Sequence, residues 1–121
     1  MMMALESPMK ITHQRDGGRL VVRIRGDIDS SQCDCLTHFW DRHVDAGVME
    51  LAADLCELDS IDGLGIAALS GLLRRTVSGG ADVTVRGAPQ TLAHTLYKIG
   101  LLRPPRGVRL IDPRDEEPTS S

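Results

Sequence analysis

Residues 54–75 read Asp-Leu-Cys-Glu-Leu-Asp-Ser-Ile-Asp-Gly-Leu-Gly-Ile-Ala-Ala-Leu-Ser-Gly-Leu-Leu-Arg-Arg, and this stretch decides the fold. Its pattern predicts the end of a strand, a short loop, and then a helix that begins abruptly at Asp62. An aspartate before a helix is a favourable cap, because its carboxylate accepts hydrogen bonds from the unpaired N–H groups of the first turn. That turn also carries partial positive charge.

The first turn of this helix contains two glycines, Gly63 and Gly65, on either side of Leu64. Glycine lets another molecule approach the backbone closely, so the pattern indicates an exposed helix start that is suited to docking. The same residues also suit an ordinary turn between a strand and a helix, and the pattern alone leaves both interpretations open. No general base, nucleophile or metal-ligand set accompanies the turn.

The composition is typical of one compact protein domain. The chain has 121 residues, of which 41% are hydrophobic and 26% are charged, and this length leaves little for a second domain. Phe39, Trp40 and Tyr97 are its only large aromatic residues, which argues against a surface that stacks on single-stranded nucleic acid. The net charge is -3 and the basic residues are scattered, so the electrostatics predict no binding to DNA or RNA.

Neither a membrane span nor a secretory signal is predicted. No apolar run approaches the roughly 18 residues that a membrane helix needs, and residues 1–9 lack the basic and apolar regions of a signal peptide. We therefore expect a cytoplasmic protein. The cysteines Cys33, Cys35 and Cys56 follow neither a disulfide framework nor a zinc spacing. Reduced thiols are expected, and no metal or cofactor.

Strands and helices alternate along the chain. The predicted strands are 9–13, 20–24, 49–54, 83–85 and 108–111, and the predicted helices are about 32–46, 63–77 and 89–99. The order β-β-α-β-α-β-α-β predicts an α/β fold, a single domain with a mixed, mostly parallel sheet. Residues 113–121 are rich in Pro, Asp, Glu, Thr and Ser and are predicted to form a disordered tail.

Local signals refine these boundaries. Residues 26–29 are expected to be a loop. Ser30 and Ser31 are the candidate caps of the first helix, and Pro89 suits the first turn of the third. His43 lies on the apolar stripe of the first helix, where a packed histidine is a more common arrangement than a ligand.

Three groups of residues occur in an order and spacing that are known from a protein family. Gly26-Asp27-Ile28-Asp29 follows a strand, Asp54-Leu55 leads through Ile61-Asp62 and Gly65 to an apolar helix, and Gly79-Gly80 and Ile99-Gly100-Leu101 flank the later elements. In this order and spacing the chain resembles the STAS domain family, specifically the small anti-sigma factor antagonists of bacteria, in which the first group reads Gly-Glu-Leu-Asp. The resemblance covers residues 9–111 and implies a STAS-like domain over residues 1–112.

One departure from the family pattern concerns regulation. The family usually has Asp-Ser-Ser-Gly or Asp-Ser-Thr-Gly at the helix start, and a partner kinase phosphorylates the serine that follows the aspartate. Here Gly63 occupies that position, and glycine has no hydroxyl to phosphorylate. The resemblance therefore implies that the usual phosphoacceptor is absent. Ser60 is a weak candidate for a displaced acceptor, because it lies on the other side of Asp62.

The resemblance implies a non-catalytic regulator of transcription. Such a protein binds an anti-sigma factor of the histidine-kinase-like ATPase type and thereby releases a sigma factor. The residues expected to contact that partner are Asp27, Asp29, Ser60, Asp62, Gly63, Leu64 and Gly65.

Two alternatives stay open at this point. The chain is also compatible with an accessory STAS subunit of a larger assembly, such as a stressosome-like complex or a lipid-transport ABC complex. An enzymatic alternative would have Asp27, Asp29 and Asp62, with Asp59, converge on Mg2+ or Ca2+, which prefer oxygen ligands. Acidic residues in loops more often cap helices and face solvent.

Overall fold

The structure is a computed structural model that describes residues 9–103 and 107–112. The elements along the chain are β1 (Met9–Asp16), β2 (Arg19–Ile28), the short 3-10 helix η1 (Ser30–Gln32), α1 (Cys33–His43), β3 (Glu50–Asp54), β4 (Leu58–Ile61), α2 (Gly63–Ser78), β5 (Asp82–Arg86), α3 (Gln90–Lys98) and β6 (Val108–Ile111). The α/β fold class is confirmed. The tail predicted at 113–121 lies outside the described residues.

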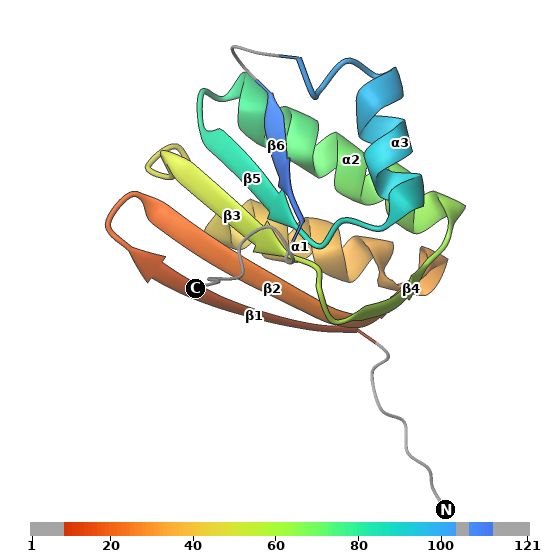
Figure 1. The fold of residues 1–121 in the computed structure, drawn as a ribbon. Coiled ribbons are helices and arrows are strands. Elements are labelled where there is room, and N and C mark those ends of the chain that lie inside the picture. Colours follow the sequence, from red (N-terminus) through yellow and green to blue (C-terminus); the bar gives the residue numbers. More distant parts are fainter. Residues whose placement is uncertain (1–8, 104–106, 113–121) are drawn as a thin grey trace, which may run out of the picture.

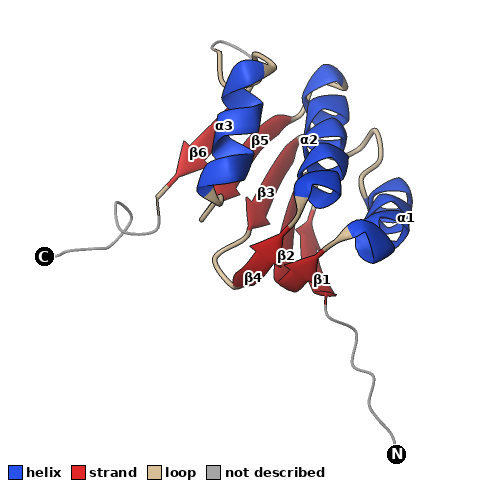
Figure 2. Ribbon diagram, turned by 90° about the vertical axis from the view of Figure 1, so that its right-hand side faces the viewer, coloured by secondary structure: helices blue, strands red, loops and turns tan. Residues whose placement is uncertain are grey.

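The strands of the described chain form one sheet in the order β1-β2-β3-β5-β6, with β4 paired beside the end of β2 (Figure 1). Among the described strands, only the hairpin β1–β2 is antiparallel, and the other pairs are parallel. The α-helices provide the crossovers between parallel strands, and they all cover the same face of the sheet (Figure 2). The other face carries no helix in the part of the chain that the structure describes.

The core lies between the sheet and its helices. Alternate residues of the central strands point into it, as the period of two requires: Leu20, Val22 and Ile24 on β2 and Val83 and Val85 on β5 are all nearly inaccessible to solvent. Burying such side chains stabilises the fold by about 1.5–3 kcal/mol each.

The largest buried side chain ties the first two helices together. Trp40 of α1 is fully buried, and its Nε1 donates a hydrogen bond of 2.9 Å to Oγ1 of Thr76 on α2. The Thr76 hydroxyl donates in turn to the carbonyl oxygen of Leu72 at 2.8 Å. A buried indole N–H without a partner would be costly, so this chain of bonds fixes how α1 lies against α2.

Two predicted loops are wrong, because they form a pair of strands. β2 continues through the predicted loop 26–29 as far as Ile28, and β4 occupies most of the predicted loop before Asp62. Leu58 and Ile61 are separated by two polar residues, so the segment lacks the alternation that predicts a strand. Its conformation comes from long-range pairing with β2.

Two helix starts also differ from the prediction. Neither Ser30 nor Ser31 is a cap: Asp29 caps η1 by accepting a bond from Ser31 N, and α1 follows without a side-chain cap. Pro89 is the residue before α3 rather than its first residue. His43 is packed, as expected, with its ring centroid 4.5 Å from that of Phe39.

The uncovered face of the sheet carries several ion pairs. Arginines on β2 face carboxylates on β3 and in the following loop, in the pairs Arg19–Glu50 (3.5 Å), Arg23–Asp54 (3.5 Å) and Arg25–Glu57 (3.1 Å). Burial raises the pKa of Asp54, but bonds from Cys56 and the charges of Arg23 and Arg86 outweigh it, so the pKa is below its usual value. Exposed pairs of this kind add little stability individually; they keep the face polar.

Candidate functional site

The candidate site is the junction of three elements: the end of β2, the short strand β4 and the start of α2. In the register of β2 with β4, Gly26 pairs with Leu58 and Asp27 pairs with Ser60, so Asp59 is an extra residue in a bulge. Gly26 has a positive φ of 88° at this point, which favours glycine. The bulge brings the end of β2 directly beside the residues that lead into α2.

Asp62 fastens the start of α2 to β2. Its backbone N–H donates to the carbonyl oxygen of Ile28 at 3.1 Å, and its Oδ1 accepts a bond of 2.8 Å from the N–H of Gly65. The prediction that Asp62 caps the helix is therefore confirmed. The carboxylate also lies where the partial positive charge of the helix start favours it.

The two glycines of the first turn have different environments. A Cβ atom added to Gly65 would lie 2.6 Å from the carbonyl oxygen of Ile28 and 3.0 Å from Cγ1 of Ile61, which is too close for any side chain. A Cβ atom added to Gly63 would meet nothing within 4 Å. Gly65 is thus required by internal packing, whereas Gly63 leaves an open position on the surface.

We predict that alanine distinguishes these positions. Gly65→Ala should lower the free energy of unfolding by about 1–3 kcal/mol, because the methyl group overpacks the contact with Ile28. Gly63→Ala should leave it unchanged or raise it by about 0.4–1 kcal/mol, because it reduces the freedom of the unfolded chain. Urea denaturation of both variants measures the difference. Equal effects at the two positions would contradict the tight contact at Gly65.

Leu64, between the glycines, projects into solvent. Its exposed fraction is 61%, although most large apolar side chains of the described chain are buried. The backbone behind it is held by the Asp62 cap and by the contact of Gly65 with β2. A large apolar side chain on a rigid, well-supported turn can contact a partner with little loss of conformational freedom.

Cys33 also belongs to this junction, and the sequence reasoning did not assign it there. Its Sγ lies 3.5 Å from the carbonyl oxygen of Asp29 and 3.6 Å from that of Leu64. Burial, followed by the negative charges of Asp62, Asp34 and Asp29, raises the pKa of the Cys33 thiol. The thiol therefore stays protonated and donates across the gap between η1 and α2. Only the tertiary structure reveals this, because Cys33 is distant from Leu64 in sequence.

The carboxylates of the junction are engaged in local bonds. Asp27 accepts a bond of 2.8 Å from the Ser60 hydroxyl, and Asp29 accepts bonds of 2.9 Å and 2.6 Å from the N–H and hydroxyl of Ser31. Asp62 holds the helix cap. Within residues 9–103 and 107–112, no group of three or more His, Cys, Asp or Glu side chains is placed to hold a metal ion.

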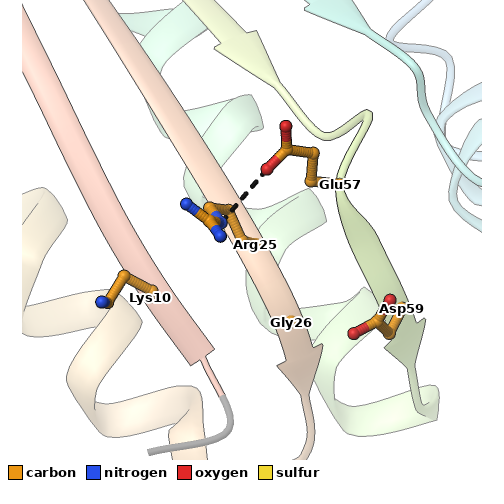
Figure 3. Close-up of a pocket in the computed structure, with 5 residues that line it drawn as sticks. All are labelled: Lys10, Arg25, Gly26, Glu57 and Asp59. Carbon is orange, nitrogen blue, oxygen red and sulfur yellow. Dashed lines mark ion pairs between the residues drawn. The ribbon is translucent and has the colours of Figure 1, made fainter.

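A shallow hollow of about 490 Å³ opens beside the junction on the uncovered face of the sheet. Figure 3 shows its lining: Lys10 on β1 and Arg25 on β2 lie toward one side, and Glu57 and Asp59 toward the other. Gly26 also lines the hollow. Arg25 is already paired with Glu57 at 3.1 Å. The hollow places the bulged Asp59 at the rim of the junction.

We predict that Asp62 is a cap and not a metal ligand. Asp62→Ala should lower the free energy of unfolding by about 0.5–2 kcal/mol, the usual loss for an N-cap. The loss should be the same in EDTA and in millimolar Mg2+ or Ca2+, because a helix cap does not depend on metal. A metal ion that bound Asp62 in the folded state alone would instead stabilise the wild-type protein further. Thermal melts of the wild-type protein and the variant in each buffer test this. A metal-dependent gain that disappears with Asp62 would revive the enzymatic alternative.

The comparison with protein families identifies the domain. The chain belongs to the STAS domain family, since the family model described as "Mlab, STAS domain" matches residues 11–111. Domains of this family are generally non-catalytic. No curated protein matches the chain. No helix in the described part of the chain is long and apolar enough to cross a membrane.

Solved structures share this fold. SpoIIAA, a cell fate determinant of Bacillus solved in its phosphorylated form, is 13% identical, with a TM-score of 0.66 over 85% of this chain and 90% of its own. An anti-sigma factor antagonist from Mycobacterium paratuberculosis is 18% identical, with a TM-score of 0.63 over 87% of this chain and 90% of its own. Similarity at these identities shows a common fold, of the type found in anti-sigma factor antagonists.

The same fold also occurs inside larger proteins. The chain matches 15% of the murine anion transporter Slc26a9, with 74% of this chain covered, 15% identity and a TM-score of 0.57. It spans 19% of Mglu, with 65% of this chain covered, 22% identity and a TM-score of 0.58. The fold is therefore found both in small antagonists and as one part of longer chains.

Proposed function

We propose that this protein is a non-catalytic regulator that docks an anti-sigma factor of the histidine-kinase-like ATPase type and thereby releases a sigma factor. The observation that supports it best is Leu64, which is 61% exposed beside the open position at Gly63. The turn that carries Leu64 is fastened by the bonds of Asp62. This is a preorganised contact for a partner surface.

The surroundings of Leu64 favour a protein partner with basic groups. Asp27, Asp29, Asp59 and Asp62 all lie near the junction, and Ser60 and Gly65 complete the set that we expect the partner to cover or to depend on. Clustered carboxylates steer a positively charged surface toward the contact and fix its orientation. Asp29 and Asp62 already accept bonds from backbone N–H groups, and Asp27 accepts one from the Ser60 hydroxyl, so these three supply charge at the rim without needing to rearrange.

The absence of a hydroxyl at Gly63 defines the regulation. In the family, phosphorylation at this position adds about two negative charges and prevents binding. Ser60 is a poor substitute, because its hydroxyl donates to Asp27 at 2.8 Å and a phosphate there would face that carboxylate. We therefore propose a constitutive antagonist, controlled by its abundance or by a signal other than phosphorylation of this turn.

We predict that a cognate anti-sigma kinase does not phosphorylate the wild-type protein and does phosphorylate Gly63→Ser. The serine should fit, because the position has free space on the surface. Mass spectrometry after incubation with kinase and ATP measures the phosphate. Stoichiometric phosphate on wild-type Ser60, or elsewhere in residues 58–65, would show that the phosphoacceptor has moved rather than vanished.

We predict that Gly63→Glu weakens binding to the anti-sigma factor at least about 30-fold, the equivalent of about 2 kcal/mol. The long side chain would occupy the space that the partner backbone needs, and its charge would be buried in the complex. Gly71→Glu is the matched control: Gly71 lies on the same helix, and a Cβ atom there also meets nothing within 4 Å. Titration by calorimetry compares both variants with the wild-type protein.

The control variant should bind like the wild-type protein. Circular dichroism should show both variants folded. Unchanged affinity of Gly63→Glu would remove the start of α2 from the interface, whereas equal weakening by both variants would point to a general effect of charge on α2.

A second candidate function is supported by the comparisons. The matching family model is described as "Mlab, STAS domain", and a domain of this fold forms part of a transporter. The chain would then be an accessory subunit that binds an ATPase of a transport or stressosome-like assembly through the same helix start. Capture from a native extract, with Gly63→Glu as the negative control, separates the candidates: an anti-sigma factor supports the first and a transporter ATPase supports the second.

A further inference from the structure

β1 is the longest border strand of the described sheet. β1 runs for 8 residues, and its ladder with β2 is continuous from Met9 opposite Gly26 to Asp16 opposite Arg19. β1 pairs with no other described strand, and Figure 1 shows it at the border of the sheet with no helix beyond it. The strand contains no proline and no bulge, which are usual protections of an edge.

The two faces of β1 have different side chains. Met9 is buried in the core, and the ring of His13 contacts that of Phe39 on α1, so these odd-numbered residues face the helices. Lys10, Thr12, Gln14 and Asp16 alternate with them and lie on the uncovered face. That face therefore carries a cation near one end of the strand and an anion at the other.

Only a few registers allow two copies of this edge to pair. Backbone groups of successive residues point alternately toward β2 and away from it, so an antiparallel pair must join residues of the same set. The two-fold axis that relates the two copies must therefore lie at one residue, which then pairs with the same residue of the second copy, and cannot lie between two residues. With the axis at His13, Lys10 lies opposite Asp16 of the second copy, and Thr12 lies opposite its Gln14. With the axis at Thr12 or Gln14, neither charge meets its opposite.

We propose that the protein forms a homodimer by antiparallel pairing of β1 with β1 of a second copy, with the two-fold axis at His13. The pairing joins two sheets into one and places Lys10 opposite Asp16 at both ends of the new ladder. On the helix side, Ile11 lies opposite Arg15 of the second copy. The Arg15 guanidinium is held on its own copy by Asp45 at 3.2 Å and by the Gly17 carbonyl at 2.9 Å, so its apolar stem is left to cover Ile11.

The charges on β1 fit self-pairing better than protection of the edge. An edge that is protected by charge repels another copy, and the register at His13 instead joins opposite charges twice. The other border strand, β6, is 4 residues long and offers only half as many positions for a ladder. Self-pairing of β1 also gives a closed two-fold dimer, whereas pairing of β1 with β6 would continue into a filament.

The test is a charge swap measured by sedimentation equilibrium. Wild-type protein should approach twice the 13.2 kDa mass of the chain as its concentration rises. Lys10→Asp alone and Asp16→Lys alone each place like charges opposite each other twice, and each should raise the dissociation constant of the dimer at least about 10-fold. An equimolar mixture of the two variants should restore dimerisation, because each copy then faces opposite charges at both ends.

Matched controls carry the same charge changes elsewhere. Lys98→Asp on α3 and Asp34→Lys on α1 alter exposed positions outside β1 and should leave the dissociation constant unchanged. Circular dichroism checks that every variant is folded, and the restored dimer in the mixture shows that both charge variants keep the strand intact. A monomer at all concentrations, or a dimer that the charge swap does not affect, would falsify the proposal.

Discussion

The contact between the first turn of α2 and the end of β2 constrains much of this structure. Asp62 donates its backbone N–H to Ile28 and caps the helix through Gly65, while Gly65 lies so close to Ile28 that no Cβ atom would fit. The carbonyl oxygen of Ile28 accepts the hydrogen bond from Asp62 and also packs closely against Gly65. These two contacts set the distance between the start of the helix and the sheet. The same contact holds the backbone on either side of Leu64, whose side chain is 61% exposed.

The bulge between β2 and β4 is what makes this contact possible. In a regular ladder Ile28 would pair with Ser60. The extra residue Asp59 shifts the register by one, so that Ile28 pairs with Ile61 and lies next to Asp62. The junction is therefore rigid at its backbone and variable at its surface. Gly63 and Leu64 are the positions where a side chain can change without disturbing the packing, because a Cβ atom on Gly63 meets nothing within 4 Å and the Leu64 side chain is 61% exposed.

Much of this arrangement could be predicted from the sequence, because its signals are local. The cap at Asp62, the helix over residues 63–77 and the strand at 83–85 each depend on residues within one turn or one element. The strand β4 and the extension of β2 could not be predicted, since the residues 58–61 form a strand only through pairing with a distant segment. The different roles of Gly63 and Gly65, and the place of Cys33 beside Leu64, likewise depend on contacts that close only in the folded chain.

The burial of Trp40 has an optical consequence. It is the single tryptophan of the chain, and its indole lies in the core with its N–H bonded to Thr76. Its fluorescence therefore reports the packing of α1 on α2 and changes when the core is exposed to water. Leu64 and its neighbours carry no comparable fluorophore. A ligand or partner that binds at the helix start without disturbing the core should therefore leave the Trp40 emission almost unchanged. Trp40 emission can thus be used to follow the folding of the core without interference from binding at the helix start.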